Sequence, residues 1–193
     1  MSTSQHFFRV LVFSLAGIIL VGVGVGQLLA DTWQVTTKRL LTASPEQVAA
    51  LVNDFATWQK WSQADANLGP QTTRTVVGTA GAVGQQIVWS GPKGKATLTL
   101  SAATANSLDY QFNFQFAGEA AAPTPRGGGR VEWRAEGAGA EIRWVDSGAW
   151  DGLAGRWVGW FGALQEKVRQ VQSSSLEALQ QQLNEPAVPP TNK

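Results

Sequence analysis

The stretch TASPEQVAALVNDFATWQKWS, residues 42–62, carries the clearest local folding signals in the chain. Ser44 is a favoured N-cap residue, and Pro45 suits the first helical position because its missing N–H would have no intrahelical partner there. Gln47 completes a capping box with Ser44. The apolar residues repeat at steps of three and four: Val48, Leu51, Val52 and Phe55. We therefore expect an amphipathic helix with one buried face, ended by the Asn-Asp pair and the Trp-rich segment that follow.

Segments on both sides of this helix are typical of β-strands. Residues 33–41 precede it, and six short stretches separated mostly by glycine turns follow, at residues 72–77, 85–90, 95–102, 107–116, 129–136 and 140–146. Alternation is clearest in the fourth stretch, where one face holds Leu108, Tyr110, Phe112, Phe114 and Phe116. The pattern predicts an antiparallel sheet with one aromatic, apolar face and one wet face. Residues 117–129 are expected to form a long mobile loop.

The last part of the chain predicts one long helix over residues 151–183. Its apolar positions form a stripe that includes Trp157, Phe161, Leu164, Val168 and Val171. That stripe needs a partner, and the apolar face of the sheet is available. A set of glycines also shares one helical face: Gly152, Gly155, Gly159 and Gly162. Two interpretations stay open for them, a gate that admits a ligand or close packing of the helix against the sheet.

Residues 10–30, VLVFSLAGIILVGVGVGQLLA, form an uncharged run about as long as a helix that crosses a bilayer. Trp33 follows at a position typical of the membrane interface. A cleaved signal peptide is the alternative, which the length of the run and the absence of a small residue two before Ala30 disfavour. We expect a tail (1–9), a single-pass transmembrane anchor in a bacterial inner membrane (10–30), a periplasmic domain (31–184) and a disordered tail (185–193).

Composition excludes several classes of function. The chain has 193 residues, with 15 Lys and Arg against 14 Asp and Glu, so no cationic field attracts nucleic acid. There is no Cys, and the single histidine, His6, precedes the predicted domain. A thiol nucleophile, a Ser-His-Asp triad and a His-ligated metal site therefore do not fit the domain. Nine Trp and eight Phe argue against a disordered chain. We expect no metal, cofactor or nucleic-acid partner.

The order strand, helix, six strands and long helix resembles the helix-grip fold of the START-like (SRPBCC) superfamily, in its polyketide cyclase/dehydrase and lipid-transport branch. The segments that carry the resemblance are TASPEQV (42–48), NDF (53–55), WQKWS (58–62), GKAT (94–97) and EIRW (141–144). The resemblance covers residues 33–183. It implies an α+β fold in which a curved antiparallel sheet grips a long C-terminal helix, with a cavity for hydrophobic small molecules between them.

We expect large side chains of the sheet and the final helix to line that cavity, with one arginine near its mouth to hold an anionic head group. The candidates are Trp89, Leu98, Tyr110, Phe112, Phe114, Trp133, Trp144, Arg156, Trp157 and Phe161. The expected function is membrane-tethered binding of a hydrophobic small molecule or lipid, without catalytic residues. Two alternatives remain: a polyketide cyclase/dehydrase-like enzyme that uses Tyr110 with Arg or Asp partners, and a ligand-free module that binds another envelope protein. Whether the chain is an enzyme stays open.

Overall fold

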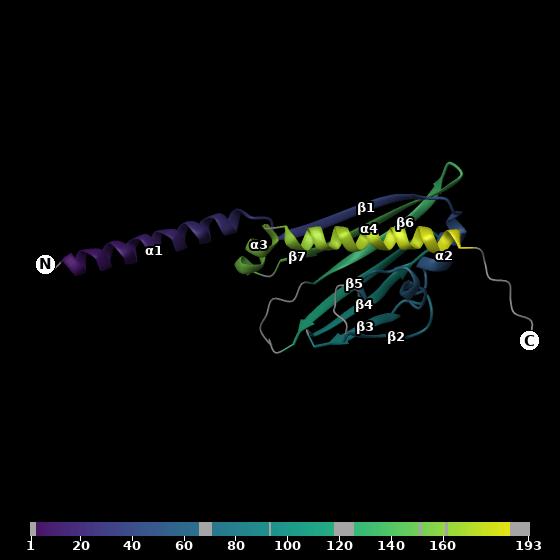
Figure 1. Cartoon of the computed structure of the whole chain (residues 1–193), viewed down its shortest axis with the longest axis horizontal. Helices are drawn as coiled ribbons and strands as arrows, with labels where there is room; N and C mark the ends of the chain where they lie inside the picture. The colour runs from purple at the N-terminus through teal and green to yellow at the C-terminus, as the bar shows by residue number, and fades with distance from the viewer. Residues whose placement is uncertain are drawn as a thin grey trace, which may run out of the picture.

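Seven strands form one curved antiparallel sheet in the order β1-β7-β6-β5-β4-β3-β2 (Figure 1). The computed structural model describes residues 3–65, 71–92, 94–117, 126–150, 152–160 and 162–185. The strands are Thr32–Leu41 (β1), Thr73–Val77 (β2), Gln86–Gly91 (β3), Gly94–Ala103 (β4), Ser107–Phe116 (β5), Arg126–Glu136 (β6) and Gly139–Ala149 (β7). All seven predicted strands are present, which confirms the α+β class.

The strand β6 begins earlier than the sequence indicated. It starts at Arg126, so residues 126–128 belong to the sheet and not to the predicted loop. A run of glycines is typical of loops, but here it lies inside the sheet, where Gly127 pairs with Phe112 of β5 and Gly148 of β7. Gly in a strand marks a place where another group approaches the backbone closely. Residues 118–125 of the predicted loop lie outside the described residues.

The helix predicted after Ser44 is confirmed as α2 (Pro45–Val52), and its capping box is complete. The Ser44 hydroxyl accepts a hydrogen bond from the Gln47 N–H at 3.4 Å, and the Ser44 N–H donates to Gln47 Oε1 at 2.9 Å. A short 3₁₀ helix, η1 (Thr57–Lys60), follows. The indole N–H of Trp58 donates to the carbonyl oxygen of Val52 at 2.8 Å, so it satisfies one of the carbonyls left free at the end of α2.

The final helix predicted as continuous is two helices, α3 (Gly152–Trp160) and α4 (Ala163–Asn184). Gly162 separates them with φ of 69°, a left-handed conformation that glycine adopts without strain. Its N–H donates to the Gly159 carbonyl at 3.0 Å, which closes α3. The prediction of one continuous helix was wrong, because glycines at this spacing fit both a glycine-lined face of one helix and the end of a helix. Asp151 and Phe161 lie outside the described residues.

Two of the four glycines pack closely against one aromatic side chain. A Cβ at Gly155 would lie 3.3 Å from Cβ of Trp150, and a Cβ at Gly159 would overlap the Trp150 indole. Close packing therefore describes these two positions, although the partner is Trp150 at the end of the sheet. The gate stays a hypothesis.

The core lies between the inner face of the sheet, α2, η1 and the C-terminal half of α4, which crosses the sheet in Figure 1. The predicted alternation is confirmed in β5 and β6. Leu108 and Tyr110 are buried while Gln111 is exposed, and Val131 is buried while Arg130 is exposed. The aromatic face of the sheet is thus the inner face, which α4 covers.

The first helix, α1 (Thr3–Leu28), projects from the end of the domain at which α3 lies (Figure 1). It begins within the segment that was predicted as a tail. Arg156 of α3 joins it to the domain, because its guanidinium donates to the Gln27 carbonyl at 3.1 Å and lies 3.7 Å from the Asp31 carboxylate. In the part of the chain that the structure describes, no helix combines the length and the apolarity needed to cross a membrane.

Candidate functional site

A cavity of ≈ 300 Å³ lies between the inner face of the sheet and the half of α4 nearest α3. We call it the sheet–helix cavity. Its walls are mostly apolar, as is usual for small-molecule sites. The sheet and the segment after η1 contribute Trp33, Ala64, Trp89, Ala96, Leu98, Tyr110, Phe112, Phe114, Trp144 and Asp146, and α4 contributes Leu164, Lys167, Val168, Val171 and Gln172.

Most of the predicted site residues meet in this cavity. The predicted residues that line it are Trp89, Leu98, Tyr110, Phe112, Phe114 and Trp144. They come from β3, β4, β5 and β7, so segments far apart in sequence form one aromatic wall. Tilted and edge-to-face ring contacts, such as the 6.2 Å centroid separation of Phe112 and Phe114, hold the wall in place.

Three predicted residues do not line the cavity. Trp133 of β6 is 1% exposed and packs in the core on the side of the sheet that α2 contacts, because the core continues past the end of the cavity. Arg156 binds the end of α1 and Asp31 instead of facing the cavity mouth. Trp157 lies beside Gly26 of α1, where an added Cβ would approach the indole Nε1 to 2.7 Å. These two side chains connect α1 to α3. Phe161 lies outside the described residues.

A hydrogen-bonded group of side chains, the buried polar cluster, lies at the inner end of the cavity. It consists of Thr37, Tyr110, Trp144, Asp146 and Gln172. The Trp144 indole N–H donates to the Tyr110 hydroxyl at 2.7 Å, and this hydroxyl donates to Asp146 Oδ1. Gln172 Nε2 donates to Asp146 Oδ2 at 2.8 Å, and Thr37 Oγ1 donates to Gln172 Oε1 at 2.6 Å. The cluster therefore ties β1, β5, β7 and α4 together around a carboxyl group that is 8% exposed.

Burial shifts the acid–base behaviour of this cluster. Burial raises the pKa of Asp146 above its usual range, while the hydrogen bonds from Tyr110 and Gln172 act in the opposite direction. Burial and the neighbouring Asp146 carboxylate both raise the pKa of Tyr110 well above its usual range. The phenol is thus a weaker acid than in water, which suits a hydrogen-bond donor better than a proton donor to a substrate.

Glycines of β6 make room for the cluster. A Cβ at residue 129 would overlap Asp146 Oδ1 and the Tyr110 ring, and one at residue 127 would overlap the Ser147 carbonyl and approach the end of the Phe112 ring. Both glycines lie on the inner face of the sheet, two and four residues before Val131. The shape of the cavity therefore requires glycine at residues 127 and 129 as well as the side chains that line it.

Asp146 and Gln172 were not among the predicted site residues, although the pattern contained a signal for each. Asp146 stands two residues after Trp144 in the same strand, so strict alternation places it on the inner face too. Gln172 stands four residues after Val168 and four before Leu176, which is the spacing of the apolar stripe of α4. A polar residue is usually exposed, but one that falls within an apolar pattern here marks a buried site.

A second cluster supports the far wall of the cavity. The Trp89 indole N–H donates to Asp65 Oδ1, and Arg74 lies 3.5 Å from Asp65 Oδ2 and 5.9 Å from the centre of the Trp89 ring. Arg74 also donates to the Phe55 carbonyl at 3.1 Å. These contacts fix the orientation of Trp89.

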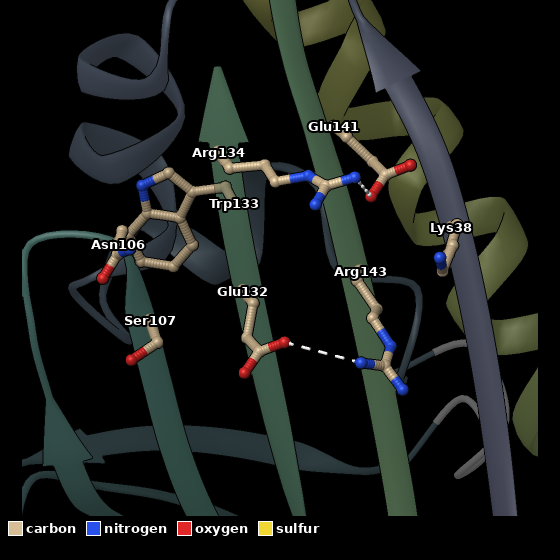
Figure 2. Close-up of a pocket in the computed structure, with 8 residues that line it drawn as sticks. All are labelled: Lys38, Asn106, Ser107, Glu132, Trp133, Arg134, Glu141 and Arg143. Atoms are coloured by element: carbon tan, nitrogen blue, oxygen red, sulfur yellow. Dashed lines mark ion pairs between the residues drawn. The ribbon is translucent and has the colours of Figure 1, made fainter. Parts of the chain in front are cut away.

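The outer face of the sheet carries a hollow of ≈ 290 Å³ with a polar, charged lining. Figure 2 shows the charged side chains that line it. The Arg143 guanidinium lies 3.8 Å from the Glu132 carboxylate, and the Arg134 guanidinium lies 3.1 Å from the Glu141 carboxylate. These partly exposed ion pairs agree with the predicted wet face and contribute little to stability. Within the described ranges, no group of three or more His, Cys, Asp or Glu side chains could hold a metal ion.

The sheet, α4 and the cavity between them define a helix-grip domain. The chain belongs to the polyketide cyclase/dehydrase and lipid transport family, whose model matches residues 32–184. A comparison with curated proteins gave no match.

Solved structures agree with this fold. CV1439 from Chromobacterium violaceum is 17% identical, with a TM-score of 0.57 over 79% of this chain and 98% of its own. A protein from Nitrosospira multiformis is 15% identical, with a TM-score of 0.57 over 79% and 97%. MLL2253 from Mesorhizobium loti is 16% identical, with a TM-score of 0.55 over 81% and 100%. At these identities the likeness concerns the fold alone.

Proposed function

We propose that this protein binds a hydrophobic small molecule or lipid in the sheet–helix cavity, without transforming it, while α1 tethers it to a membrane. The sheet–helix cavity is the observation that carries the proposal, because it lies beside a well-filled core and its walls are apolar and aromatic. A small molecule that occupied it would bury its apolar surface against these rings. The family also includes lipid transport in its description.

The tether is supported by residues 10–30 and by the surface of α1. The segment has no charge, and large apolar side chains of α1 are exposed, among them Phe13, Ile18, Leu20 and Leu28. An exposed apolar surface of this kind needs a partner in water, and a bilayer provides one. We propose a bacterial inner membrane with the domain on the periplasmic side. The cavity would then lie near the source of its ligands.

Extraction of the purified full chain tests the binding. The protein is reconstituted in nanodiscs and extracted with organic solvent, and the extract is compared by mass spectrometry with that of empty nanodiscs. We expect an enriched apolar compound that is lost in Leu98→Trp, which fills the cavity, and kept in Gln111→Trp, which places the same ring on the exposed face of β5. Equal extracts from the two variants and the original chain would refute binding in this cavity.

Fractionation tests the tether. The full chain is expected to stay with membranes after an alkaline carbonate wash and to be digested by protease added to spheroplasts. A chain without residues 1–30 is expected in the soluble fraction. Release of the full chain by carbonate, or protection from the protease, would contradict the tether or its orientation respectively.

The enzyme alternative has one observation in its favour, the contact between the Tyr110 hydroxyl and Asp146. It requires Tyr110 to exchange a proton with a substrate, and the raised pKa of Tyr110 opposes this. Tyr110→Phe separates the two functions. Loss of a measured turnover with unchanged ligand affinity would favour the enzyme, whereas a change in affinity alone would favour binding.

A further inference from the structure

The polar end of the sheet–helix cavity gives information about the ligand. This inference rests on the proposed function. Almost the whole wall is apolar, so the buried polar cluster is the main place at which a ligand could form hydrogen bonds away from the mouth. A polar group of a ligand that enters the apolar cavity needs such a partner, because burial without a hydrogen bond is unfavourable. The unused hydrogen-bonding capacity of the cluster therefore selects the ligand.

The hydrogen-bonding groups of the cluster that are still available to a ligand are mainly acceptors. The Trp144 N–H, the Tyr110 hydroxyl and the Thr37 hydroxyl all donate to partners within the cluster. Each Asp146 oxygen accepts one of these hydrogen bonds, from Tyr110 or Gln172, and has room for a second. Of the donors in the cluster, a second hydrogen on Gln172 Nε2 remains. A ligand group that donates to Asp146 would thus complete the cluster.

We propose that the ligand carries a neutral hydroxyl group, which binds Asp146 at the inner end of the cavity while its apolar body lies between β5 and α4. A hydroxyl both donates and accepts, so it fits the cluster whether Asp146 carries a proton or not. A carboxylate would meet the like charge of Asp146 when that residue is ionised. An ammonium group would pair with an ionised Asp146, but both charges would then lie in an apolar cavity, where the cost of removing them from water can exceed their attraction.

The position of the cationic residue agrees with this orientation. Lys167 is the basic residue among those that line the cavity, and it is exposed on α4, whereas the buried polar cluster lies against the core. The inner end thus offers a carboxyl group and the outer rim an ammonium group. A ligand with an anionic end would keep that end at the rim, and the hydroxyl would enter first.

Four eight-carbon probes of matched shape test the proposal on the full chain in nanodiscs, with empty nanodiscs as blanks. They are 1-octanol, its isomer 1-methoxyheptane, octylamine and octanoate, and their dissociation constants are measured by titration calorimetry. We expect octanol to bind about tenfold or more tightly than the ether, because the ether lacks the one donor hydrogen. Octanol is also expected to bind more tightly than octylamine and octanoate.

Substitution of the carboxyl group gives the second test. In Asp146→Asn the discrimination against octanoate should fall to less than about threefold, because the buried charge is removed. The control Asp109→Asn makes the same change on the wet face of β5 and should leave all four affinities unchanged. Equal binding of octanol and its ether, or tightest binding of the amine or the acid, would overturn the proposal and leave the proposed function intact. Absence of binding by all four probes would overturn both.

Discussion

Residue 129 must be glycine because the side chains of the buried polar cluster leave no space for a methyl group. A methyl group at residue 129 would overlap Asp146 Oδ1 and the ring of Tyr110. We predict that Gly129→Ala lowers the free energy of unfolding by about 1–3 kcal/mol, the usual cost of overpacking a filled interior. Urea unfolding followed by Trp fluorescence measures it.

Gly24→Ala is the control for this prediction, since a Cβ at Gly24 has nothing within 4 Å. It should leave the urea midpoint of the domain unchanged. An equal midpoint for the original chain and Gly129→Ala would show that β6 and Tyr110 can move apart without cost.

Asp146 should make stability depend on pH in a direction opposite to that of an ion-paired carboxylate. Burial raises its pKa in the folded chain above the value of about 3.9 for an unfolded chain. Between these two values the folded state holds more protons, so the free energy of unfolding falls as pH rises through this window. We predict that Asp146→Asn removes this fall, as measured by urea unfolding at several pH values from about 4 to 8.

Asp109→Asn, on the wet face, should retain the pH dependence of the original chain. If Asp146→Asn retained it as well, the carboxyl group of Asp146 would titrate alike in the folded and unfolded states.

The apolar wall of the site was largely predicted, whereas its buried Asp146 and Gln172 were missed. Alternation along β5 is sufficient to place Tyr110, Phe112 and Phe114 on one face of the sheet. The same rule applies to Asp146, but whether its carboxyl group can stay buried depends on the hydrogen bonds from Tyr110 of β5 and Gln172 of α4, and Gln172 is itself held by Thr37 of β1. Such partners are far away in sequence, so no local pattern reveals that Gln172 and Thr37 meet there.

At the scale of an element, α2 shows local sequence signals that agree with one another. Its Ser44 hydroxyl satisfies the Gln47 N–H, and Gln47 satisfies the Ser44 N–H. We predict that Ser44→Ala costs about 1 kcal/mol of stability, the usual value for loss of an N-cap, measured as a shift in the urea midpoint. The control Ser173→Ala changes an exposed serine of α4 and should shift the midpoint far less. Equal shifts would mean that the cap contributes no more than any surface serine.

The division between α3 and α4 shows where element-level prediction ends. Gly155 and Gly159 serve packing against Trp150, while Gly162 ends α3 by adopting positive φ. Sequence spacing treats these glycines alike, because it contains neither the position of Trp150 nor the backbone conformation. The run of glycines at the start of β6 was misinterpreted for a similar reason, since its bulky neighbours come from β5 and β7.

At the scale of the whole molecule, the connection between α1 and the domain can be tested through Arg156. Its contacts with Gln27 and Asp31 join the end of α1 to α3. We predict that Arg156→Ala changes the free energy of unfolding by less than about 1 kcal/mol, because exposed ion pairs contribute little. Amide hydrogen exchange at residues 26–31 and in α3 should nevertheless become faster.

Arg169→Ala is the matched control, because Arg169 pairs with Glu166 within α4. It should leave exchange at residues 26–31 unchanged. Unchanged exchange in Arg156→Ala too would show that the packing of Gly26 against Leu153 and Trp157 is sufficient for this connection.

The architecture as a whole followed from the order of its elements, because one amphipathic helix and one single-faced sheet have few ways to bury their apolar surfaces. The roles of Arg156 and Trp157 did not follow. Both stand on α3, and the break at Gly162 directs α3 toward α1 instead of along the cavity. The roles of these two residues depend on how α3 packs against α1, which the local sequence does not contain.

The packing of Trp58, Trp61 and Trp144 has an optical consequence. Their ring centroids are 4.9, 5.7 and 5.9 Å apart, and the rings are tilted or edge-to-face. The strong far-ultraviolet transitions of indoles couple at such separations, so circular dichroism should contain a pair of bands of opposite sign there. The near-ultraviolet signal of these rings should vanish when the packing is lost. All three chromophores lie in the core, and Trp144 also lines the cavity. Under the proposed function, a single spectrum would therefore follow both the folding of the chain and the occupancy of the cavity.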